Sequence, residues 1–218
     1  MNELKAVLFD IDGTLLDNND FHKKAWMEYL KGEGKEISDE EFKDKISGRT
    51  NLDAVQHIYD KEMSVEEAEK YYLKKEEIYR KLYEPHIAPI NGLIDFLKQL
   101  QESNITMALA TSGIQVNIDF MFEHIPIKQY FKTIIQAKDI ENGKPDPEIF
   151  IKTAEALHIP AKNCVVFEDS TSGVEAGKAA KMKVVALTTT HTPEELDKAD
   201  LVIDDYTGIT VDRLRTLL

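Results

Sequence analysis

The stretch that decides the fold is Lys5-Ala-Val-Leu-Phe-Asp-Ile-Asp-Gly-Thr14. A short apolar run that passes directly into an Asp-Gly pair predicts a buried strand followed by a loop. Similar apolar runs recur further along the chain, at residues 105–110, 133–136, 164–167, 183–187 and 201–203, with helical patterns over 91–102, 146–158 and 174–180. Strand and helix therefore alternate from about residue 90 onward. This alternation predicts an α/β fold with a doubly wound, mostly parallel, Rossmann-like sheet covered by helices on both faces.

Residues 17–84 break this alternation. The segment is very polar, and its apolar residues recur at helical spacing, as in Phe21, Ala25 and Tyr29. These helices could simply cover one face of the sheet. An insertion is favoured because no strand pattern interrupts nearly 70 residues, an unusual gap within a simple doubly wound sheet. We expect residues 1–16 and 85–218 to form the α/β core and residues 17–84 to form a separate helical domain.

The composition limits the partners of the protein. The 218 residues include 27 Lys and Arg against 40 Asp and Glu, for a formal charge of −13. This acidity argues against nucleic acid and against anionic membranes, because a phosphate surface requires a basic face. The apolar runs are far shorter than the roughly 20 residues of a membrane span. A single cysteine, Cys164, and no recognisable signal peptide predict a reducing cytoplasm, and the charged surface without a heptad repeat predicts a monomer.

Two carboxylates, Asp10 and Asp12, stand where the first strand ends. Ligands of open α/β sheets bind at the carboxyl ends of the strands, and clustered oxygen atoms suit a hard cation such as Mg²⁺. An ordinary Asp-Gly turn would explain the same residues. A calcium-binding loop fits less well, because it requires glycine at its sixth position, which is Leu15 here.

Three further segments carry polar residues at the expected edge of the sheet. Thr111 and Ser112 follow one strand, where a hydroxyl and free N–H groups could bind phosphate or simply cap a helix. Lys144 precedes a helix and suits a phosphoryl oxygen, although a solvated lysine is the ordinary alternative. Glu168 and Asp169 end another strand, as metal ligands or as the start of a capped helix.

Taken in order, these motifs resemble those of the haloacid dehalogenase superfamily of phosphotransferases, and the resemblance covers essentially the whole chain. The segment 17–84 resembles the small cap domain of that superfamily. The subgroup with the greatest similarity holds β-phosphoglucomutases and phosphoglycolate-type phosphatases. The resemblance implies that Asp10 is the nucleophile and that Asp12 is the general acid and base. It also implies that Asp10, the Asp12 carbonyl and Asp169 hold Mg²⁺, with Glu168 acting directly or through a water.

The resemblance also assigns the phosphate and cap contacts. Thr111 and Lys144 would bind the oxygens of the phosphoryl group, with Ser112 beside them. His22, and Arg49 in the loop Ser47-Gly48-Arg49-Thr50, would face the substrate from the cap.

The resemblance leaves two enzymatic functions open. A mutase must grip a second phosphate, yet Asn51, Gly113 and Ile114 stand where the mutases of the subgroup carry phosphate-binding side chains. We therefore expect a Mg²⁺-dependent phosphatase that hydrolyses a small phosphorylated metabolite through an aspartyl phosphate. A β-phosphoglucomutase-type mutase is the alternative. A non-catalytic protein that binds a phosphorylated metabolite is an alternative of another class.

Overall fold

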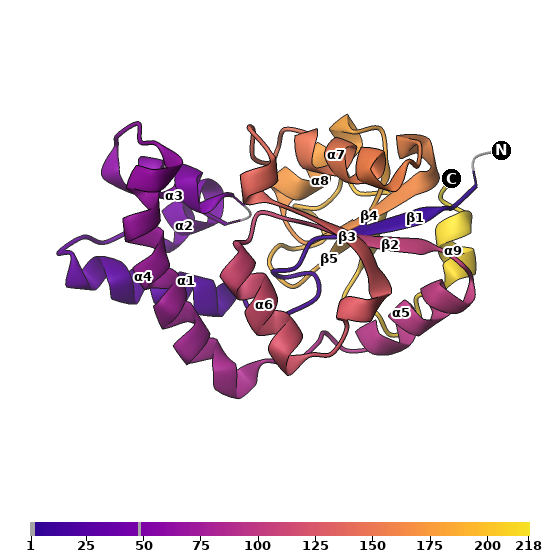
Figure 1. Ribbon diagram of the computed structural model, residues 1–218, viewed down its shortest axis with the longest axis horizontal. Helices are drawn as coiled ribbons and strands as arrows, with labels where there is room; N and C mark the ends of the chain where they lie inside the picture. Colours follow the sequence, from indigo (N-terminus) through magenta and orange to yellow (C-terminus); the bar gives the residue numbers. More distant parts are fainter. Residues whose placement is uncertain (1–2, 48) are drawn as a thin grey trace.

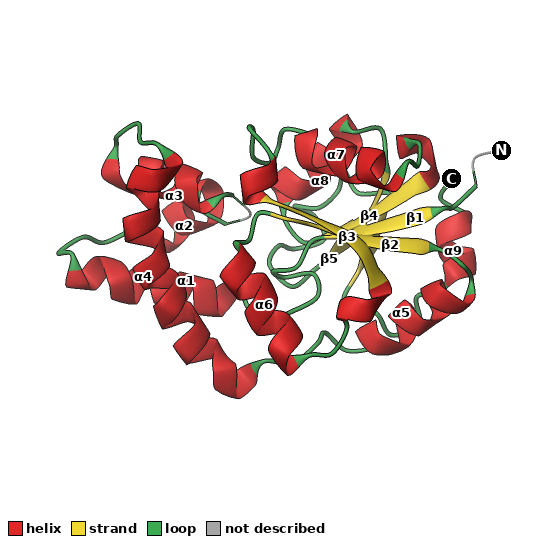
Figure 2. Cartoon of the chain, in the orientation of Figure 1, coloured by secondary structure: helices red, strands yellow, loops and turns green. Residues whose placement is uncertain are grey.

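A six-stranded parallel sheet forms the centre of the molecule in the computed structural model, which describes residues 3–47 and 49–218. The sheet has the strand order β3-β2-β1-β4-β5-β6, with every neighbouring pair parallel. Its strands are β1 (Ala6–Phe9), β2 (Thr106–Thr111), β3 (Phe131–Gln136), β4 (Cys164–Glu168), β5 (Lys183–Leu187) and β6 (Leu201–Ile203). The predicted α/β fold is confirmed (Figure 2). Of the predicted loop Ser47–Thr50, Gly48 lies outside the described residues.

Side chains of the central strands alternate between two hydrophobic layers. Val7 and Phe9 of β1 point into a layer that also holds α5 (Leu93–Glu102), α6 (Gln115–His124) and α9 (Val211–Arg215). Ala6 and Leu8 point into the opposite layer, with α7 (Glu148–Leu157) and α8 (Thr171–Ala179). Figure 1 shows these two groups of helices on opposite sides of the sheet. Because both faces are covered, the central strands β1 and β4 are buried at every position and lack the polar alternation of a solvated sheet.

The helices of the core were predicted unevenly. Helices α5, α7 and α8 lie within or close to the ranges expected for them, and α6 and α9 were not predicted. Ile118 and Met121 of α6 are buried at helical spacing, but further apolar residues, Val116 and Phe120, lie on another side of the helix. The periodicity of this helix is therefore weak in the sequence.

Four helices follow β1 and lie together beyond the ends of the strands: α1 (Asn19–Gly32), α2 (Asp39–Lys45), α3 (Asn51–Tyr59) and α4 (Val65–Tyr83) (Figure 1). They share a hydrophobic cluster of their own, which includes Trp26, Val55 and Tyr72. Ser64 and Thr50 accept hydrogen bonds from the third residue of α4 and α3 and so begin these helices with capping boxes. The helical nature of this segment is confirmed. That it moves as a separate domain stays a prediction.

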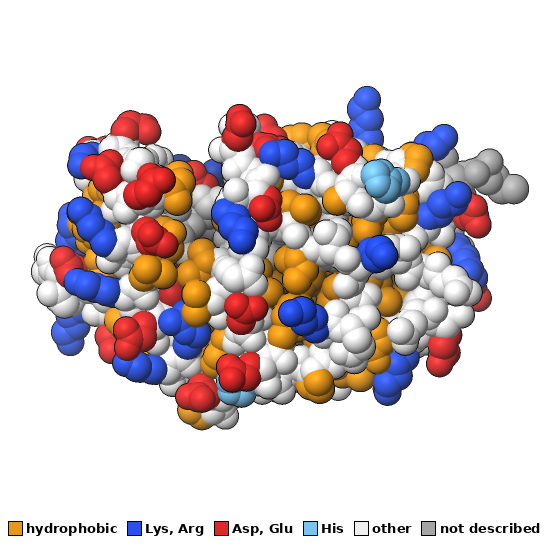
Figure 3. Space-filling view, viewed as in Figure 1, with side chains coloured by type: hydrophobic (Ala, Val, Ile, Leu, Met, Phe, Trp, Pro, Cys, Tyr) orange, Lys and Arg blue, Asp and Glu red, His pale blue; other side chains and the backbone are white. Residues whose placement is uncertain are grey.

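The surface carries charges of both signs, and Figure 3 shows Lys, Arg, Asp and Glu interspersed over the face that it presents. Within residues 3–47 and 49–218, every helix is too short or too polar to cross a membrane.

Candidate active site

Asp10 lies directly after β1 and forms a buried ion pair with Lys144 from the loop before α7. The Asp10 backbone N–H donates to the Phe167 carbonyl of the neighbouring strand, which fixes its position at the edge of the sheet. Lys144 Nζ lies 2.8 Å from Asp10 Oδ1 and also donates to Glu168 Oε1. The lysine is only 2% exposed. One ammonium group is thus held between two buried carboxylates from β1 and β4.

Burial and neighbouring charge act in opposite directions on this trio. Burial raises the pKa of Asp10, to about 7, although Lys144 lowers it, while Glu168 and Asp12 add to the increase. Burial would lower the pKa of Lys144, but Asp10 and Glu168 outweigh it and hold that pKa above its usual value. The lysine is therefore charged, and the local negative charge is only partly compensated by it.

Glu168 is fully engaged by the protein. Its Oε2 accepts hydrogen bonds from the backbone N–H groups of Asp169 and Ser170 and from the Ser170 hydroxyl, all at 3.0–3.1 Å. A Cβ at Gly173 would lie within 1.9–2.2 Å of the carboxyl group, so only glycine fits there in the first turn of α8. Glu168 therefore anchors Lys144 and the beginning of α8.

Asp169 is the third buried carboxylate at this edge of the sheet. Burial raises its pKa well above the usual value, and the negative charges of Glu168 and Asp10 add to the increase. The carboxylate accepts hydrogen bonds from Asn19 Nδ2, at 2.9 Å, and from the Thr190 hydroxyl. Gly13, at φ +71°, passes so close that a Cβ would lie 2.0 Å from Asp169 Oδ2.

This donor set fits Mg²⁺. The described residues contain no group of three or more His, Cys, Asp or Glu side chains arranged as metal ligands. Mg²⁺ commonly uses only one or two carboxylates and keeps several waters, so Asp10, Asp169 and a backbone carbonyl are a sufficient set. The raised pKa values of Asp10 and Asp169 point the same way, because a divalent cation would offset both the burial and the repulsion that raise them.

Asp12 occupies a different environment from Asp10. Asn18 Nδ2 donates to Asp12 Oδ1 at 2.6 Å, and His22 Nε2 lies 3.3 Å from the same oxygen without meeting hydrogen-bond geometry. Burial raises the pKa of Asp12, but His22, Asn18 and Lys75 outweigh it and lower that pKa to about 2. The two carboxylates, two residues apart, are therefore pushed in opposite directions, with the higher pKa on Asp10 and the lower pKa on Asp12. A nucleophile and a proton donor need the reverse order, so a bound cation and a bound phosphate would have to shift both pKa values.

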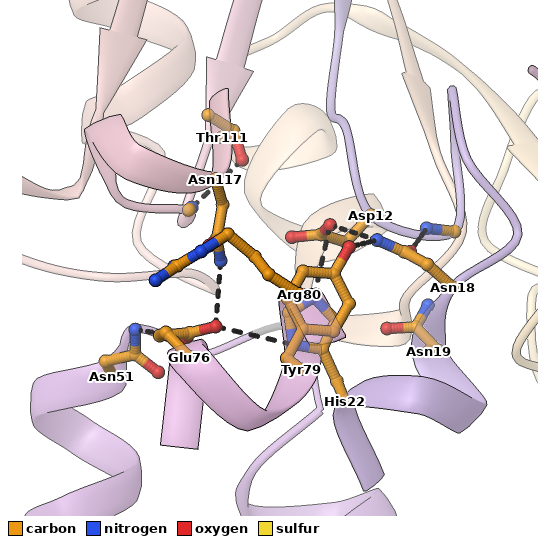
Figure 4. A network of polar contacts seen from close by, with 12 residues as sticks. Asp12, Asn18, Asn19, His22, Asn51, Glu76, Tyr79, Arg80, Thr111 and Asn117 are labelled. Atoms are coloured by element: carbon orange, nitrogen blue, oxygen red, sulfur yellow. Dashed lines mark hydrogen bonds and ion pairs between the residues drawn. The ribbon is translucent and has the colours of Figure 1, made fainter. Parts of the chain in front are cut away.

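A polar network from α1, α3, α4 and α6 forms the wall opposite Asp12 (Figure 4). The His22 ring stacks on Tyr79 with centroids 3.7 Å apart. His22 Nδ1 lies 2.8 Å from Lys75 Nζ, which donates in turn to Glu76 at 3.0 Å. Glu76 accepts hydrogen bonds from Asn51 and from Asn117, each at 2.8 Å.

The predicted site residues meet at one cavity of about 70 Å³. Its lining includes nearly all of them: Asp10, Asp12, His22, Arg49, Ser112, Lys144, Glu168 and Asp169. Thr111 is the exception among the described residues, since it is buried behind the lining and its hydroxyl accepts the Gly113 N–H at 2.9 Å. Ser112 Oγ is buried without a hydrogen-bond partner among the described residues. Of these two neighbouring residues, Ser112 thus lines the cavity, whereas Thr111 holds the shape of the turn.

Residues 7–187 match the family model of the haloacid dehalogenase-like hydrolases. The chain belongs to this family. It is accordingly an enzyme whose named relatives are phosphatases, and the resemblance seen in the sequence is confirmed.

Several proteins with functional names are similar to this chain. The chain is 30% identical over 214 residues to validoxylamine A 7'-phosphate phosphatase of Streptomyces hygroscopicus, covering 94% of this chain and 95% of that protein. It is 29% identical to hexitol phosphatase A of Escherichia coli, over 95% and 94% of the two chains. It is 28% identical to the chloroplastic 5-amino-6-(5-phospho-D-ribitylamino)uracil phosphatase of Arabidopsis thaliana, covering 97% of this chain but only 57% of that longer protein.

Solved structures of the haloacid dehalogenase-like hydrolases have the same fold. A family IA, variant 3 hydrolase from Entamoeba histolytica superposes with a TM-score of 0.87 at 32% identity, over 98% of this chain and 99% of the other. A β-phosphoglucomutase from Clostridium difficile superposes with a TM-score of 0.85 at 26% identity, over 98% and 96% of the two chains.

Sequence reasoning missed the residues that complete the wall: Asn18, Lys75, Glu76, Tyr79 and Asn117. A signal was present for α4, because Tyr72, Lys75, Glu76 and Tyr79 recur at the spacing of one helix face. Charged residues on an otherwise apolar stripe indicate buried charge. No comparable signal marks Asn117, since its role depends on how α6 meets α4.

Proposed function

We propose that the protein is a Mg²⁺-dependent phosphatase that hydrolyses a small phosphorylated metabolite through an aspartyl phosphate on Asp10. The observation that carries the proposal is the buried contact between Asp10 and Lys144, with Asp12 two residues further on and all three lining one cavity. A nucleophile, a fixed cation and a separate proton carrier are the parts that phosphoryl transfer requires.

In the first step, an oxygen of Asp10 attacks the phosphorus, and the bond to the ester oxygen breaks. The departing oxygen takes a proton from Asp12. Asp12 is ionised while His22 and Lys75 lie beside it, because they lower its pKa. An entering phosphate dianion opposes that effect by like-charge repulsion and favours the protonated Asp12 that this step needs.

In the second step, water attacks the phosphorus of the aspartyl phosphate. Asp12 takes a proton from that water, the bond between phosphorus and Asp10 breaks, and inorganic phosphate leaves. Asn18 holds the Asp12 carboxylate in place through its 2.6 Å hydrogen bond. With its pKa lowered, Asp12 is ionised and so has a free oxygen that can orient the water and accept its proton. The negative charge of the bound phosphoryl group opposes the effect of His22 and Lys75 and makes Asp12 a stronger base.

Lys144 and Ser112 bind the phosphoryl oxygens in this proposal. Lys144 supplies a fixed positive charge, and Glu168 positions it from the opposite side. Ser112 lines the cavity, and its buried hydroxyl has no hydrogen-bond partner among the described residues, so it has a hydrogen bond to offer. Thr111 contributes by holding the Gly113 N–H and thereby the shape of the turn.

Mg²⁺ would be held by Asp10, Asp169 and the Asp12 carbonyl. When bound, it supplies Lewis-acid charge neutralisation to the transferring phosphoryl group. Hydrogen bonds from Asn19 and Thr190 hold the Asp169 carboxylate in place.

The helices of residues 17–84 are proposed as a movable cap. The chain joins them to the core near residues 16–19 and 83–89, and closure would exclude bulk water from the cavity. His22 and Arg49 line the cavity from this side, which supports their assignment to substrate contacts. We expect a monomer in a reducing cytoplasm, on the grounds of charge and of the single cysteine.

The named relatives support a carbohydrate-like phosphate ester as the substrate, since they include a hexitol phosphatase and a phosphatase of phosphorylated carbohydrates. The mutase alternative is supported by the fold it shares with β-phosphoglucomutase, but Asn51, Gly113 and Ile114 offer no cation for a second phosphate. We therefore propose hydrolysis of the ester rather than transfer of the phosphoryl group within a sugar phosphate.

The test is a screen for inorganic phosphate release over sugar phosphates, phosphoglycolate, nucleotides and pyrophosphate. β-Glucose 1-phosphate with a trace of the 1,6-bisphosphate separates the alternatives. We expect phosphate release that is lost in Asp10→Asn and retained in Asp95→Asn, which makes the same change at an exposed site. Glucose 6-phosphate formed well ahead of phosphate would assign the mutase instead, and binding without turnover of any ester would assign the non-catalytic function.

A further inference from the structure

Three hydrogen-bond donors converge on the carboxylate of Glu76. Asn51 Nδ2 and Lys75 Nζ donate to Oε1 at 2.8 and 3.0 Å, and Asn117 Nδ2 donates to Oε2 at 2.8 Å. The donors come from α3, α4 and α6. Such convergence of an ammonium and two amides from separate elements is the arrangement expected around a bound anion. Here the anion belongs to the protein.

Glu76 belongs to the same cavity as Asp10. Both residues line it, together with Asn51, Lys75 and Asn117. Figure 4 shows Glu76 between Asn51 and Asn117. Glu76 is 2% exposed. Arg80, one turn further along α4, donates to the side-chain oxygen Oδ1 of Asn117 at 2.9 Å. The Asn117 amide is thus fixed at both ends, with its N–H group turned to Glu76. The carboxylate has a fixed position in the wall that faces the leaving group.

This arrangement has two consequences for a substrate. Three of the groups that could otherwise bind a distal phosphate are already occupied, because Lys75, Asn51 and Asn117 all donate to Glu76. The Glu76 carboxylate also balances the charge of Lys75, so this buried pair offers a distal phosphate no net positive charge. A hydroxyl group meets neither obstacle, since it can donate to a carboxylate oxygen and accept from an amide.

We propose that Glu76 is a specificity-determining residue that restricts this phosphatase to monophosphate esters with neutral, hydroxylated leaving groups and rejects esters with a second anionic group. The proposal rests on the proposed function and names the substrate class of that site. Glu76 acts as a permanent occupant of the place where a second phosphate would bind.

The test compares two esters that differ by one phosphate, fructose 1-phosphate and fructose 1,6-bisphosphate. The quantity measured is the ratio of their kcat/KM values for phosphate release from carbon 1, in the wild type and in Glu76→Gln. Glutamine keeps the shape and one acceptor oxygen but removes the charge. We expect the wild type to favour the monophosphate and Glu76→Gln to lower the ratio at least tenfold.

Glu77→Gln is the matched control. It removes the same charge one residue along α4, where Glu77 is exposed and pairs with Lys81. The ratio should stay at its wild-type value in this variant. Asn51→Lys serves as a second variant if Glu76→Gln folds poorly, since a second ammonium beside Glu76, in addition to Lys75, gives this wall a net positive charge without removing the carboxylate and should move the ratio in the same direction.

A binding measurement keeps this proposal separate from the proposed function. In the Asp10→Asn background, calorimetry with both esters should give a tighter monophosphate complex, and adding Glu76→Gln should reverse or abolish that preference. An unchanged ratio in folded Glu76→Gln, or a wild type that favours the bisphosphate, would overturn the role of Glu76. Failure of the wild type to release phosphate from any ester would instead contradict the proposed function.

Discussion

Replacing Lys144 by methionine removes the positive charge that lies between Asp10 and Glu168 while keeping a side chain of similar length. Lys144 contacts both carboxylates, and the lysine and Glu168 are almost completely buried. Removing one partner of a buried ion pair costs about 3–5 kcal/mol, because the other charge stays buried without compensation. For a chain of this size the melting temperature should fall by roughly 6–20 °C at pH 7, since each kcal/mol corresponds to roughly 2–4 °C.

The stability lost in Lys144→Met should be smaller at low pH than at neutral pH. In Lys144→Met, burial raises the folded-state pKa of Asp10 with no lysine to oppose it. Groups whose pKa is raised on folding destabilise the fold at high pH, and the penalty shrinks as the pH falls through the raised values toward the unfolded value of about 4. The stability difference between variant and wild type should therefore narrow from pH 7 to pH 5.

The assay is chemical denaturation at pH 7 and pH 5 in the presence of a chelator, because Mg²⁺ binding would stabilise the variant by compensating the buried carboxylates. Lys98→Met is the control, since Lys98 is exposed and pairs only with Asp95 on its own helix. Its effect should stay within about 0.5 kcal/mol. A Lys144→Met protein within about 1 kcal/mol of the wild type at pH 7 would refute the reasoning about the buried ion pair.

Three further predictions follow from particular contacts. Chelation with EDTA should abolish phosphate release, and added Mg²⁺ should restore it; full turnover after metal removal would contradict the proposed cation. Gly13→Ala should reduce kcat at least tenfold, because its Cβ would displace Asp169, whereas Gly34→Ala has a similar positive φ in open space and should keep wild-type activity. Burial raises the pKa of Asp200, but hydrogen bonds from two lysines, one in α8 and one in β5, outweigh it and lower that pKa. The stabilisation that Asp200 gives the fold is therefore present above the unfolded pKa of about 4 and is lost as the pH falls through the lowered, folded-state pKa. Asp200→Asn should thus destabilise the fold by about 1–2 kcal/mol at pH 7 and by little at pH 3, as measured by denaturation.

The strands and their order of appearance were accessible from the sequence because both faces of the sheet are covered. A strand buried on both sides is apolar at every position, and each such run here ends in a polar loop. The convergence of Asp10, Asp12, Lys144 and Asp169 at one cavity follows from a rule of parallel sheets, whose strand ends share one edge. Local pattern and topology therefore agree at this part of the molecule.

The wall formed by α3, α4 and α6 was less accessible because its residues depend on contacts between distant elements. Lys75 and Glu76 stand in a charged run that is typical of a solvated helix, and only their neighbours' spacing indicates burial. Thr111 and Ser112 illustrate the same limit at finer scale. Both hydroxyls follow β2, but the turn directs one to a backbone N–H and the other to the cavity, a distinction that periodicity does not contain.

The central claim is that Asp10 carries the phosphoryl group during turnover. Its most direct test is a single-turnover reaction with an accepted phosphate ester, quenched in acid within milliseconds and followed by mass spectrometry of the intact chain and its peptides. We predict a transient chain that is heavier by one phosphoryl group, with the group on the peptide that contains Asp10, and no such species in Asp10→Asn. Turnover without a phosphorylated chain at any time, or a phosphoryl group on a peptide that lacks Asp10, would contradict the account.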